Sequence, residues 1–166
     1  MLRPVPTVHL LTGLIGAGKT TLARRLEREL PALRISLDEW IVGLFGKEMP
    51  EPLTGEFWFE RAERSYSFAL PLARQALAAG LDVVLDCGFL LLVERERARA
   101  FAADAGAATR LYSVRADTDV RRERVRSRNR ERGETFAIVV REDMFDSLTF
   151  EPPTPEELAG AVVVET

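Results

Sequence analysis

The chain has 166 residues, of which 46% are hydrophobic and 30% charged, and its formal net charge is −3. Because a folded domain takes about 150 residues, we expect residues 1–166 to form one domain with enough apolar material for a packed core. One cysteine, Cys87, and one histidine, His9, exclude an internal disulfide and any zinc site built from several such residues. The acidic balance disfavours a generally basic nucleic-acid surface, and the cysteine usage is typical of a reducing cytoplasm.

The start of the chain contains an apolar run that could be mistaken for a secretion signal. Pro4 and Pro6 interrupt it, and the polar residues His9 and Thr12 dilute it. No stretch approaches the ~20 apolar residues that a membrane span requires. We therefore expect a soluble, cytoplasmic protein with no membrane partner.

Hydrophobic patterning predicts alternating strands and helices. Strands are expected at residues 7–11, 34–37, 81–86, 110–116 and 161–165. Helices are expected at residues 19–30, 39–44, 56–79, 94–105, 118–130 and 136–148. Glycines and prolines at residues 43–55 indicate a long loop, interpreted as a substrate flap, and FEPPTPEEL at 150–158 is a proline-rich segment. The alternation predicts an α/β fold with a mainly parallel sheet, which binds ligands beyond the carboxyl ends of its strands.

The segment GLIGAGKT satisfies the pattern GxxxxGK[ST], and it lies between a predicted strand and a predicted helix. Such glycines let backbone amides turn toward phosphate oxygens, aided by the positive end of the helix. We expect Lys19 to bridge the β- and γ-phosphates of ATP and the Thr20 hydroxyl to ligate Mg²⁺. The predicted nucleotide site consists of Gly13, Leu14, Ile15, Gly16, Ala17, Gly18, Lys19, Thr20, Thr21, Arg124 and Arg128.

Two classes of nucleotide hydrolase are disfavoured. GTPases read guanine with an NKxD motif, but the only asparagine, Asn129, is followed by Arg130. Motor and remodelling ATPases need a larger core, or a ring of partners, than this length provides.

Two aspartates follow predicted strands at the edge where a phosphate would bind. Asp38 is predicted to accept a proton from an attacking hydroxyl, and its alternative role is to cap a helix that begins at Glu39. Asp86 is predicted to hold Mg²⁺ or its water, and its alternative role is in a turn before Gly88.

Nine arginines fall between residues 110 and 132, and the helix at 118–130 sorts several of them by direction. With about 100° per residue, Val120 and Val125 define the inward face of this helix. The arginines predicted to face inward are Arg121, Arg124, Arg128 and Arg132. Those predicted to be solvated are Arg122, Arg126 and Arg130. Inward guanidinium groups suit an anion and would neutralise a phosphoryl group in transfer.

Structural roles are expected for the remaining chemically notable residues. His9 is predicted to pack in the core, and Cys87 has no histidine to activate it as a nucleophile. The aromatic residues are predicted to be mostly core, with one or two lining an acceptor pocket. They are Trp40, Phe57, Trp58, Tyr66 and Phe89.

Together these pieces resemble the AAA-type small P-loop kinases grouped with polynucleotide 5′-hydroxyl kinases, zeta toxins and chloramphenicol phosphotransferases. The likeness runs through GLIGAGKT, ISLDEW, VVLDCGF, SRNRERG and FEPPTPEEL. It implies a three-layer fold, with a five-stranded parallel sheet between helices and a short arginine-rich lid. It further implies Mg²⁺-ATP as donor, Asp38 as catalytic base, and Arg128 and Arg132 as lid arginines acting with Lys19.

One departure concerns the acceptor. Polynucleotide kinases carry an arginine shortly after the base aspartate, whereas this sequence continues Glu39-Trp40-Ile41-Val42. We therefore expect an ATP-dependent kinase acting on a hydroxyl of a small molecule, with nucleic acid disfavoured as a partner. The alternatives are a polynucleotide or nucleotide 5′-hydroxyl kinase and a non-catalytic ATP-binding regulatory protein.

Overall fold

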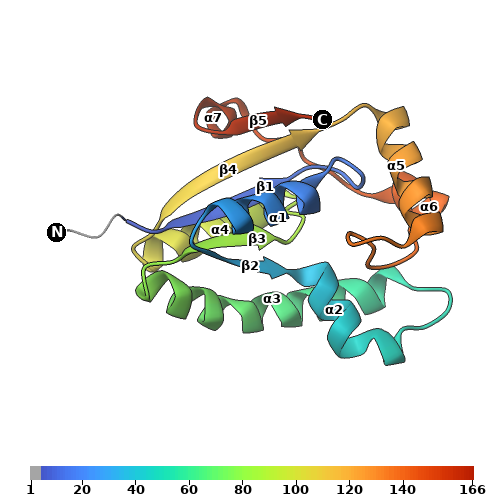
Figure 1. The fold of residues 1–166 in the computed structure, drawn as a ribbon, viewed down its shortest axis with the longest axis horizontal. Coiled ribbons are helices and arrows are strands. Elements are labelled where there is room, and N and C mark those ends of the chain that lie inside the picture. Colours follow the sequence, from blue (N-terminus) through green and yellow to red (C-terminus); the bar gives the residue numbers. More distant parts are fainter. Residues whose placement is uncertain (1–4) are drawn as a thin grey trace.

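The computed structural model describes residues 5–166, which contain a five-stranded sheet in the order β2-β3-β1-β4-β5 (Figure 1). Every neighbouring pair of strands is parallel. The strands are β1 (Thr7–Thr12), β2 (Ala32–Ser36), β3 (Asp82–Asp86), β4 (Ala108–Arg115) and β5 (Val162–Glu165). At the centre, Leu10 of β1 lies opposite Leu85 on one side and Leu111 on the other. The predicted parallel α/β sheet is confirmed.

Helices connect the strands and cover both faces of the sheet (Figure 1). They are α1 (Lys19–Glu29), α2 (Leu37–Phe45), α3 (Gly55–Ala78), α4 (Leu92–Asp104), α5 (Thr118–Glu131), α6 (Glu142–Ser147) and α7 (Pro155–Ala159), with a short 3-10 helix at Gly46–Glu48.

The strand alternation divides the core between the two faces. Val8 and Leu10 pack with α2, α3 and α4, whereas Leu11 packs with α1 on the opposite face. In β3, Val84 faces α1. Because alternate residues of a strand share a face, Asp86 is directed toward the α1 side as well. This register brings a strand-end carboxylate to the helix that follows the glycine loop.

The loop between β1 and α1 is pressed against the sheet. A Cβ at Gly13, where φ is +148°, would lie 2.2 Å from the carbonyl oxygen of Val114 in β4. Glycine is therefore required for this close approach.

The predicted helix at 136–148 is wrong over most of its length, since only α6 forms and residues 132–141 are irregular. The Asn129 side chain donates to the Val140 carbonyl at 2.8 Å and accepts from the Val140 amide at 3.1 Å. These bonds take up backbone groups that a helix would use internally. We call residues 132–141 the lid segment.

Several other boundaries differ from expectation by about two residues, as at the starts of β2, β4 and α4. α2 begins at Leu37, two residues before the predicted start. The proline-rich segment contains α7, which begins at Pro155 and has a capping box formed by Thr154 and Glu157. Proline in the first turn removes a donor that has no helical partner anyway, so it favours this start.

Within residues 5–166, none of the helices combines the length and apolar character needed to cross a bilayer.

Candidate functional site

A cavity of about 780 Å³ opens at the carboxyl edge of the sheet. Its lining residues come from the glycine loop, α2, the first half of α3, the residues after β3, α5 and the lid segment. Figure 1 shows where these elements lie relative to the sheet. This is the edge at which open parallel sheets bind ligands. The predicted residues Lys19, Asp38, Asp86 and Arg128 all line it.

The glycine loop wraps around the start of α1. Gly16 has φ +80°, and a Cβ there would lie 2.6 Å from the Arg121 carbonyl oxygen. Lys19 Nζ donates to the carbonyl oxygens of Gly13 at 2.7 Å and Leu14 at 3.1 Å. Burial lowers the pKa of Lys19, and the negative charges of Asp86 and Asp38 oppose that shift. The ammonium group is thus held over the loop where a phosphate would lie.

Asp86 is the last residue of β3 and is only 6% exposed. Burial raises its pKa, against the opposing effects of Lys19, a hydrogen bond from Thr20, and Arg34. Its Oδ2 atom has no hydrogen-bond partner, and the nearest guanidinium nitrogen, Arg34 Nη1, lies 3.9 Å away and is also unpaired. Buried polar atoms are normally satisfied, so this oxygen fits a missing ligand or water.

The residues present fit a magnesium ion. Mg²⁺ prefers oxygen ligands and is commonly held by one or two protein groups together with substrate phosphates. Thr20 offers a hydroxyl and Asp86 offers the unpaired carboxylate oxygen. The described part of the chain has no cluster of three or more His, Cys, Asp or Glu that could hold a metal alone.

Asp38 lies in the first turn of α2 and faces the cavity. The N-cap of α2 is Ser36, so the alternative in which Asp38 caps a helix beginning at Glu39 is wrong. The residue is exposed to the cavity. Even so, the surrounding protein raises the pKa of Asp38 to about 6, with help from the charge of Asp86 and against Lys19 and Arg128. A carboxylate with that pKa is mostly ionised at neutral pH and suits a general base.

The arginines of α5 divide only partly as predicted. Arg121 is buried and donates to the Ile15 carbonyl at 3.2 Å, beneath the glycine loop. Arg128 is half-buried, its Nε has no partner, and burial lowers its pKa against the effect of Asp38. Arg124 lines the cavity but is exposed, and it donates to Thr166 Oγ1 at 2.7 Å. Val120 is 39% exposed, so it does not belong to the inward face.

The inward orientation predicted for Arg132 is wrong. α5 ends at Glu131, and Arg132 takes a left-handed conformation with φ +49°. Its side chain is exposed over the Phe136 ring, outside the set that lines the cavity. Its position on a helical wheel therefore has no meaning.

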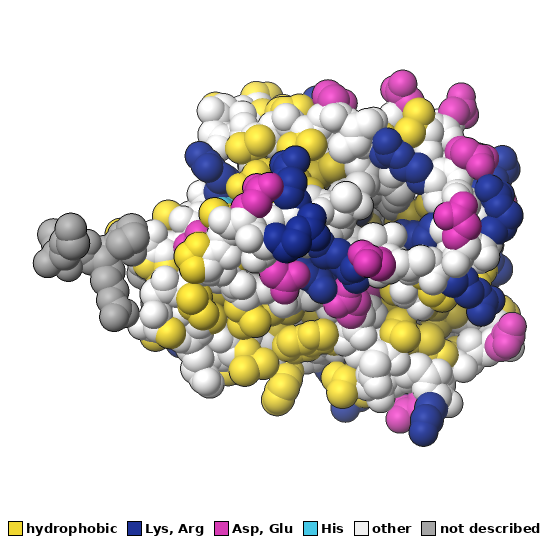
Figure 2. All heavy atoms as spheres, viewed as in Figure 1, with side chains coloured by type: hydrophobic (Ala, Val, Ile, Leu, Met, Phe, Trp, Pro, Cys, Tyr) yellow, Lys and Arg dark blue, Asp and Glu magenta, His cyan; other side chains and the backbone are white. Residues whose placement is uncertain are grey.

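The predicted exposure of the outer arginines is confirmed for Arg126 and Arg130, whereas Arg122 is partly buried. Figure 2 shows basic and acidic side chains interspersed over this end of the molecule. Arg122 and Arg126 both pair with Glu142, and Arg130 pairs with Glu123 at 3.2 Å.

The lid segment is fastened to α1 by contacts that the sequence did not indicate. Arg24 Nη2 donates to the Glu134 carbonyl oxygen at 2.6 Å, and its Nη1 lies 3.2 Å from Glu134 Oε2. The same guanidinium reaches Glu39 of α2 at 3.0 Å. A charged residue on the outer face of α1 was the only signal available, and it does not identify a partner.

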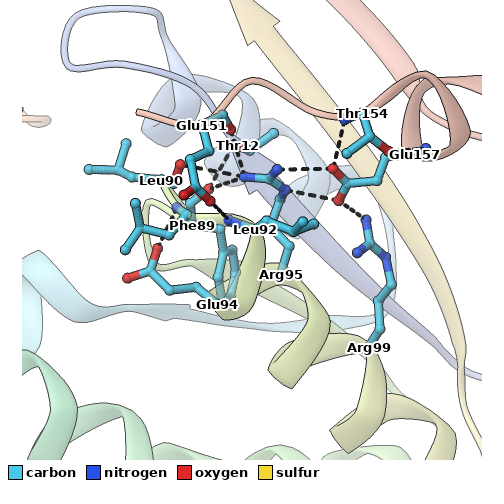
Figure 3. Close-up of polar contacts among 11 residues, drawn as sticks. Thr12, Phe89, Leu90, Leu92, Glu94, Arg95, Arg99, Glu151, Thr154 and Glu157 are labelled. Carbon is cyan, nitrogen blue, oxygen red and sulfur yellow. Dashed lines mark hydrogen bonds and ion pairs between the residues drawn. The ribbon is translucent and has the colours of Figure 1, made fainter. Parts of the chain in front are cut away.

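A second charged cluster supports the cavity wall after β3 (Figure 3). Arg95 is fully buried and donates to both carboxylate oxygens of Glu157 at 2.9 Å. It also donates to the carbonyls of Glu151 at 3.0 Å and Phe89 at 3.3 Å. Thr12 donates to the same Phe89 carbonyl at 2.7 Å. The cluster fixes Phe89, whose φ is +39°, between β1, α4 and the C-terminal segment.

The remaining predicted residues behave as follows. Thr21 lines the cavity. His9 is buried and bonded to Tyr112 and Asp82, as a packed core residue. Burial raises the pKa of the Cys87 thiol well above its usual value, which disfavours a thiolate nucleophile. Of the five aromatic residues named above, those that line the cavity are Trp58, Tyr66 and Phe89.

Comparisons with solved structures identify proteins of the same fold. A proposed kinase from Chloroflexus aurantiacus J-10-fl superposes with a TM-score of 0.74 at 23% identity, covering 98% of this chain and 89% of that one. Kti12 from Chaetomium thermophilum, in complex with ADP-AlF3, gives a TM-score of 0.71 at 19% identity, with 97% and 88% covered. The Mycobacterium tuberculosis APS kinase CysC, in complex with AMPPNP and APS, gives 0.63 at 19%, with 98% and 89% covered.

A search of curated proteins finds no significant match. The model of a family described as AAA domain matches residues 8–150, which include the glycine loop, Asp38, Asp86 and α5. The chain therefore belongs to this AAA-domain family and has a P-loop kinase-like fold.

Proposed function

We propose that this protein is an ATP-dependent kinase that transfers the γ-phosphate of Mg²⁺-ATP to a hydroxyl group of a small molecule. The observation that carries the proposal is the position of Asp38, which lines the same cavity as the glycine loop and has its pKa raised to about 6. A protein that only binds nucleotide has no use for a base tuned in this way.

The chain's own residues account for nucleotide binding. Backbone amides of the glycine loop and the amino end of α1 would hold the phosphate oxygens, and Lys19 would exchange its bonds to loop carbonyls for bonds to phosphate. Thr20 and Asp86 would hold Mg²⁺, which when bound neutralises phosphate charge.

Proton and phosphoryl transfer can then be assigned. Asp38 takes the proton of the acceptor hydroxyl as that oxygen forms a bond to the γ-phosphorus. The bond from the γ-phosphorus to the β–γ bridging oxygen breaks, and ADP leaves with those electrons. Arg128, with an unpaired buried Nε, would stabilise charge on the transferring group.

The experiment is phosphoryl transfer from γ-labelled ATP with Mg²⁺ to pooled alcohols, sugars, nucleosides and 5′-hydroxyl oligonucleotides. Label in a small-molecule product supports the proposal. Label only in an oligonucleotide would favour the polynucleotide kinase alternative. Tight ATP binding without any transfer across the pools would favour a regulatory protein.

A further inference from the structure

The cavity has an apolar side, which lies opposite the glycine loop and the arginines of α5. Trp58, Phe59, Ala62 and Tyr66 recur along one face of α3, as helical spacing requires. With Leu53 before α3 and Leu90 before α4, they form what we call the ring wall. Phe59 is 61% exposed. An exposed aromatic ring inside a cavity is a characteristic contact for an apolar ligand.

Charges next to the ring wall are already paired. Arg97 Nη1 lies 2.7 Å from Glu63 Oε1, and its guanidinium lies 5.0 Å from the Tyr66 ring centre. Arg141 forms two bonds to Asp143, at 2.9 and 2.8 Å.

The other cavity-lining cations among residues 5–166 are Lys19, Arg124 and Arg128. None of these three has a carboxylate at ion-pair distance, and all belong to the nucleotide side. An anionic acceptor binds best to a cation without a carboxylate partner, and the cations beside the ring wall, Arg97 and Arg141, both have one.

One polar group of the ring wall has no partner. Tyr66 is 6% exposed, and its hydroxyl is buried without a hydrogen bond. Its ring packs edge-on against Phe89, at 6.2 Å between ring centres, which fixes the direction of the side chain. The hydroxyl oxygen is closed off from solvent, so a ligand reaches it only when the side chains around it shift, and a bond made there would relieve the unfavourable unpaired state.

We propose that the ring wall is the acceptor site and that it selects an uncharged molecule carrying an apolar ring, with a polar group bonded to Tyr66 Oη. The proposal rests on the kinase function for the fate of this molecule, but its binding can be tested separately. Phosphate-bearing acceptors, including nucleotides and nucleic acid, are disfavoured at the ring wall, because Arg97 and Arg141 already face carboxylates.

The test uses two probes of similar size, neutral 2-phenylethanol and anionic phenyl phosphate. Their affinities are measured by NMR titration, with and without saturating AMP-PNP and Mg²⁺, which occupy the glycine loop. With the loop occupied, the wild type is expected to bind 2-phenylethanol more tightly than phenyl phosphate. Tyr66→Phe is expected to lower the affinity for 2-phenylethanol by about threefold to tenfold, because one hydrogen bond is lost.

A second variant is designed to change the preference between the neutral and the anionic probe. Glu63→Gln leaves Arg97 without its partner, so phenyl phosphate is expected to bind about tenfold more tightly while 2-phenylethanol changes little. The matched control is Glu60→Gln, because Glu60 lies on α3 but pairs with Arg61 and Arg64 outside the cavity.

The possible negative results separate the ring-wall assignment from the proposed kinase function. Tighter binding of phenyl phosphate than of 2-phenylethanol by the wild type, or no effect of Glu63→Gln, would overturn the assignment of the ring wall. Absence of AMP-PNP binding would instead contradict the proposed kinase function, and the effect of Glu63→Gln relative to Glu60→Gln would still decide the selectivity.

Discussion

Two groups of charged side chains lie on either side of Phe89, and they differ in how completely they are paired. In the first, Arg95 bonds to Glu157 and to backbone carbonyls, and the pKa of Glu157 is lowered to about 2, mainly by its bonds to Arg95. In the second, Lys19, Asp38, Asp86 and Arg128 share a cavity, and Asp86 Oδ2 and Arg128 Nε have no hydrogen-bond partners.

This difference indicates that the first group stabilises the fold and the second is available to a substrate. A buried ion pair with every bond made holds the chain together, and removing one partner leaves an uncompensated charge. Groups held close together but unpaired retain bonding capacity for a substrate, and their pKa values move toward neutrality. We therefore expect substitutions in the first group to reduce stability, and substitutions in the second to reduce activity without unfolding the protein.

The largest effect is expected from Lys19→Ala. Turnover should fall on the order of 10³-fold, because a preorganised charge at the transferring phosphate is lost. Stability should change little, since Lys19 bonds only to loop carbonyls. Calorimetric ATP titration and labelled transfer measure both, with the other lysine, Lys47→Ala, as control. Unchanged ATP binding and turnover would remove Lys19 from the site.

Arg95→Ala tests the opposite side of the comparison. Glu157 would keep Arg99 and the Thr154 amide but lose its bidentate partner, and the Phe89 and Glu151 carbonyls would lose a buried donor, so we expect unfolding to become easier by about 2–4 kcal/mol. Urea denaturation followed by circular dichroism gives the free energy. Arg74→Ala is the control, because its pair with Asp104 is exposed and contributes little. Equal stability of the two variants would contradict the structural role of the Arg95 cluster.

Arg128→Lys is expected to reduce turnover about 10–100-fold despite keeping the charge, since an ammonium group cannot reproduce a planar fork. Arg130→Lys, two residues along α5 and paired with Glu123, should remain active. Steady-state transfer kinetics distinguish the two. If both variants were fully active, Arg128 would have no catalytic role.

The smallest effect is expected at the lid segment. Arg24→Ala removes the bonds to Glu134, and hydrogen exchange across residues 133–141 should quicken about two- to fivefold, the usual scale for exposed pairs. Arg25→Ala is the control, because Arg25 pairs with Glu29 on its own helix. Exchange that is insensitive to both Arg24→Ala and bound AMP-PNP would show that the segment does not act as a lid.

The sequence predicted the sheet and the glycine loop because both are local patterns. Val83, Val84 and Leu85 form a continuously apolar strand, and GLIGAGKT encodes its own geometry. The prediction of a helix at 136–148 was wrong because the conformation of the lid segment depends on the bonds between Asn129 and Val140, eleven residues apart. The predicted inward direction of Arg132 was wrong because it assumed helical geometry at a residue that lies beyond the end of α5.

Sequence patterns also could not predict contacts between residues that lie far apart in the chain. In the sequence, Arg95 has the pattern of a charged residue on a surface helix. Its partner Glu157 is 62 residues away, so only the structure reveals the pair. Tyr66 fits a core stripe of α3, and only the structure shows that its hydroxyl is buried without a partner beside a cavity. Periodicity predicts which face of a helix is buried, but not what that face encloses.

The central claim is that Asp38 is the base, and the pH dependence of turnover tests it most directly. With a pKa raised to about 6, the carboxylate is ionised above that pH, so turnover should fall about tenfold per pH unit below it. Asp38→Asn should lose about 10²–10⁴-fold in turnover at pH 7.5 and lose this pH dependence, while keeping ATP affinity. Its stability should be equal or greater, because the surrounding protein and the charge of Asp86 disfavour the ionised carboxylate in the folded state. An Asp38→Asn variant with full activity and an unchanged pH profile would contradict the account.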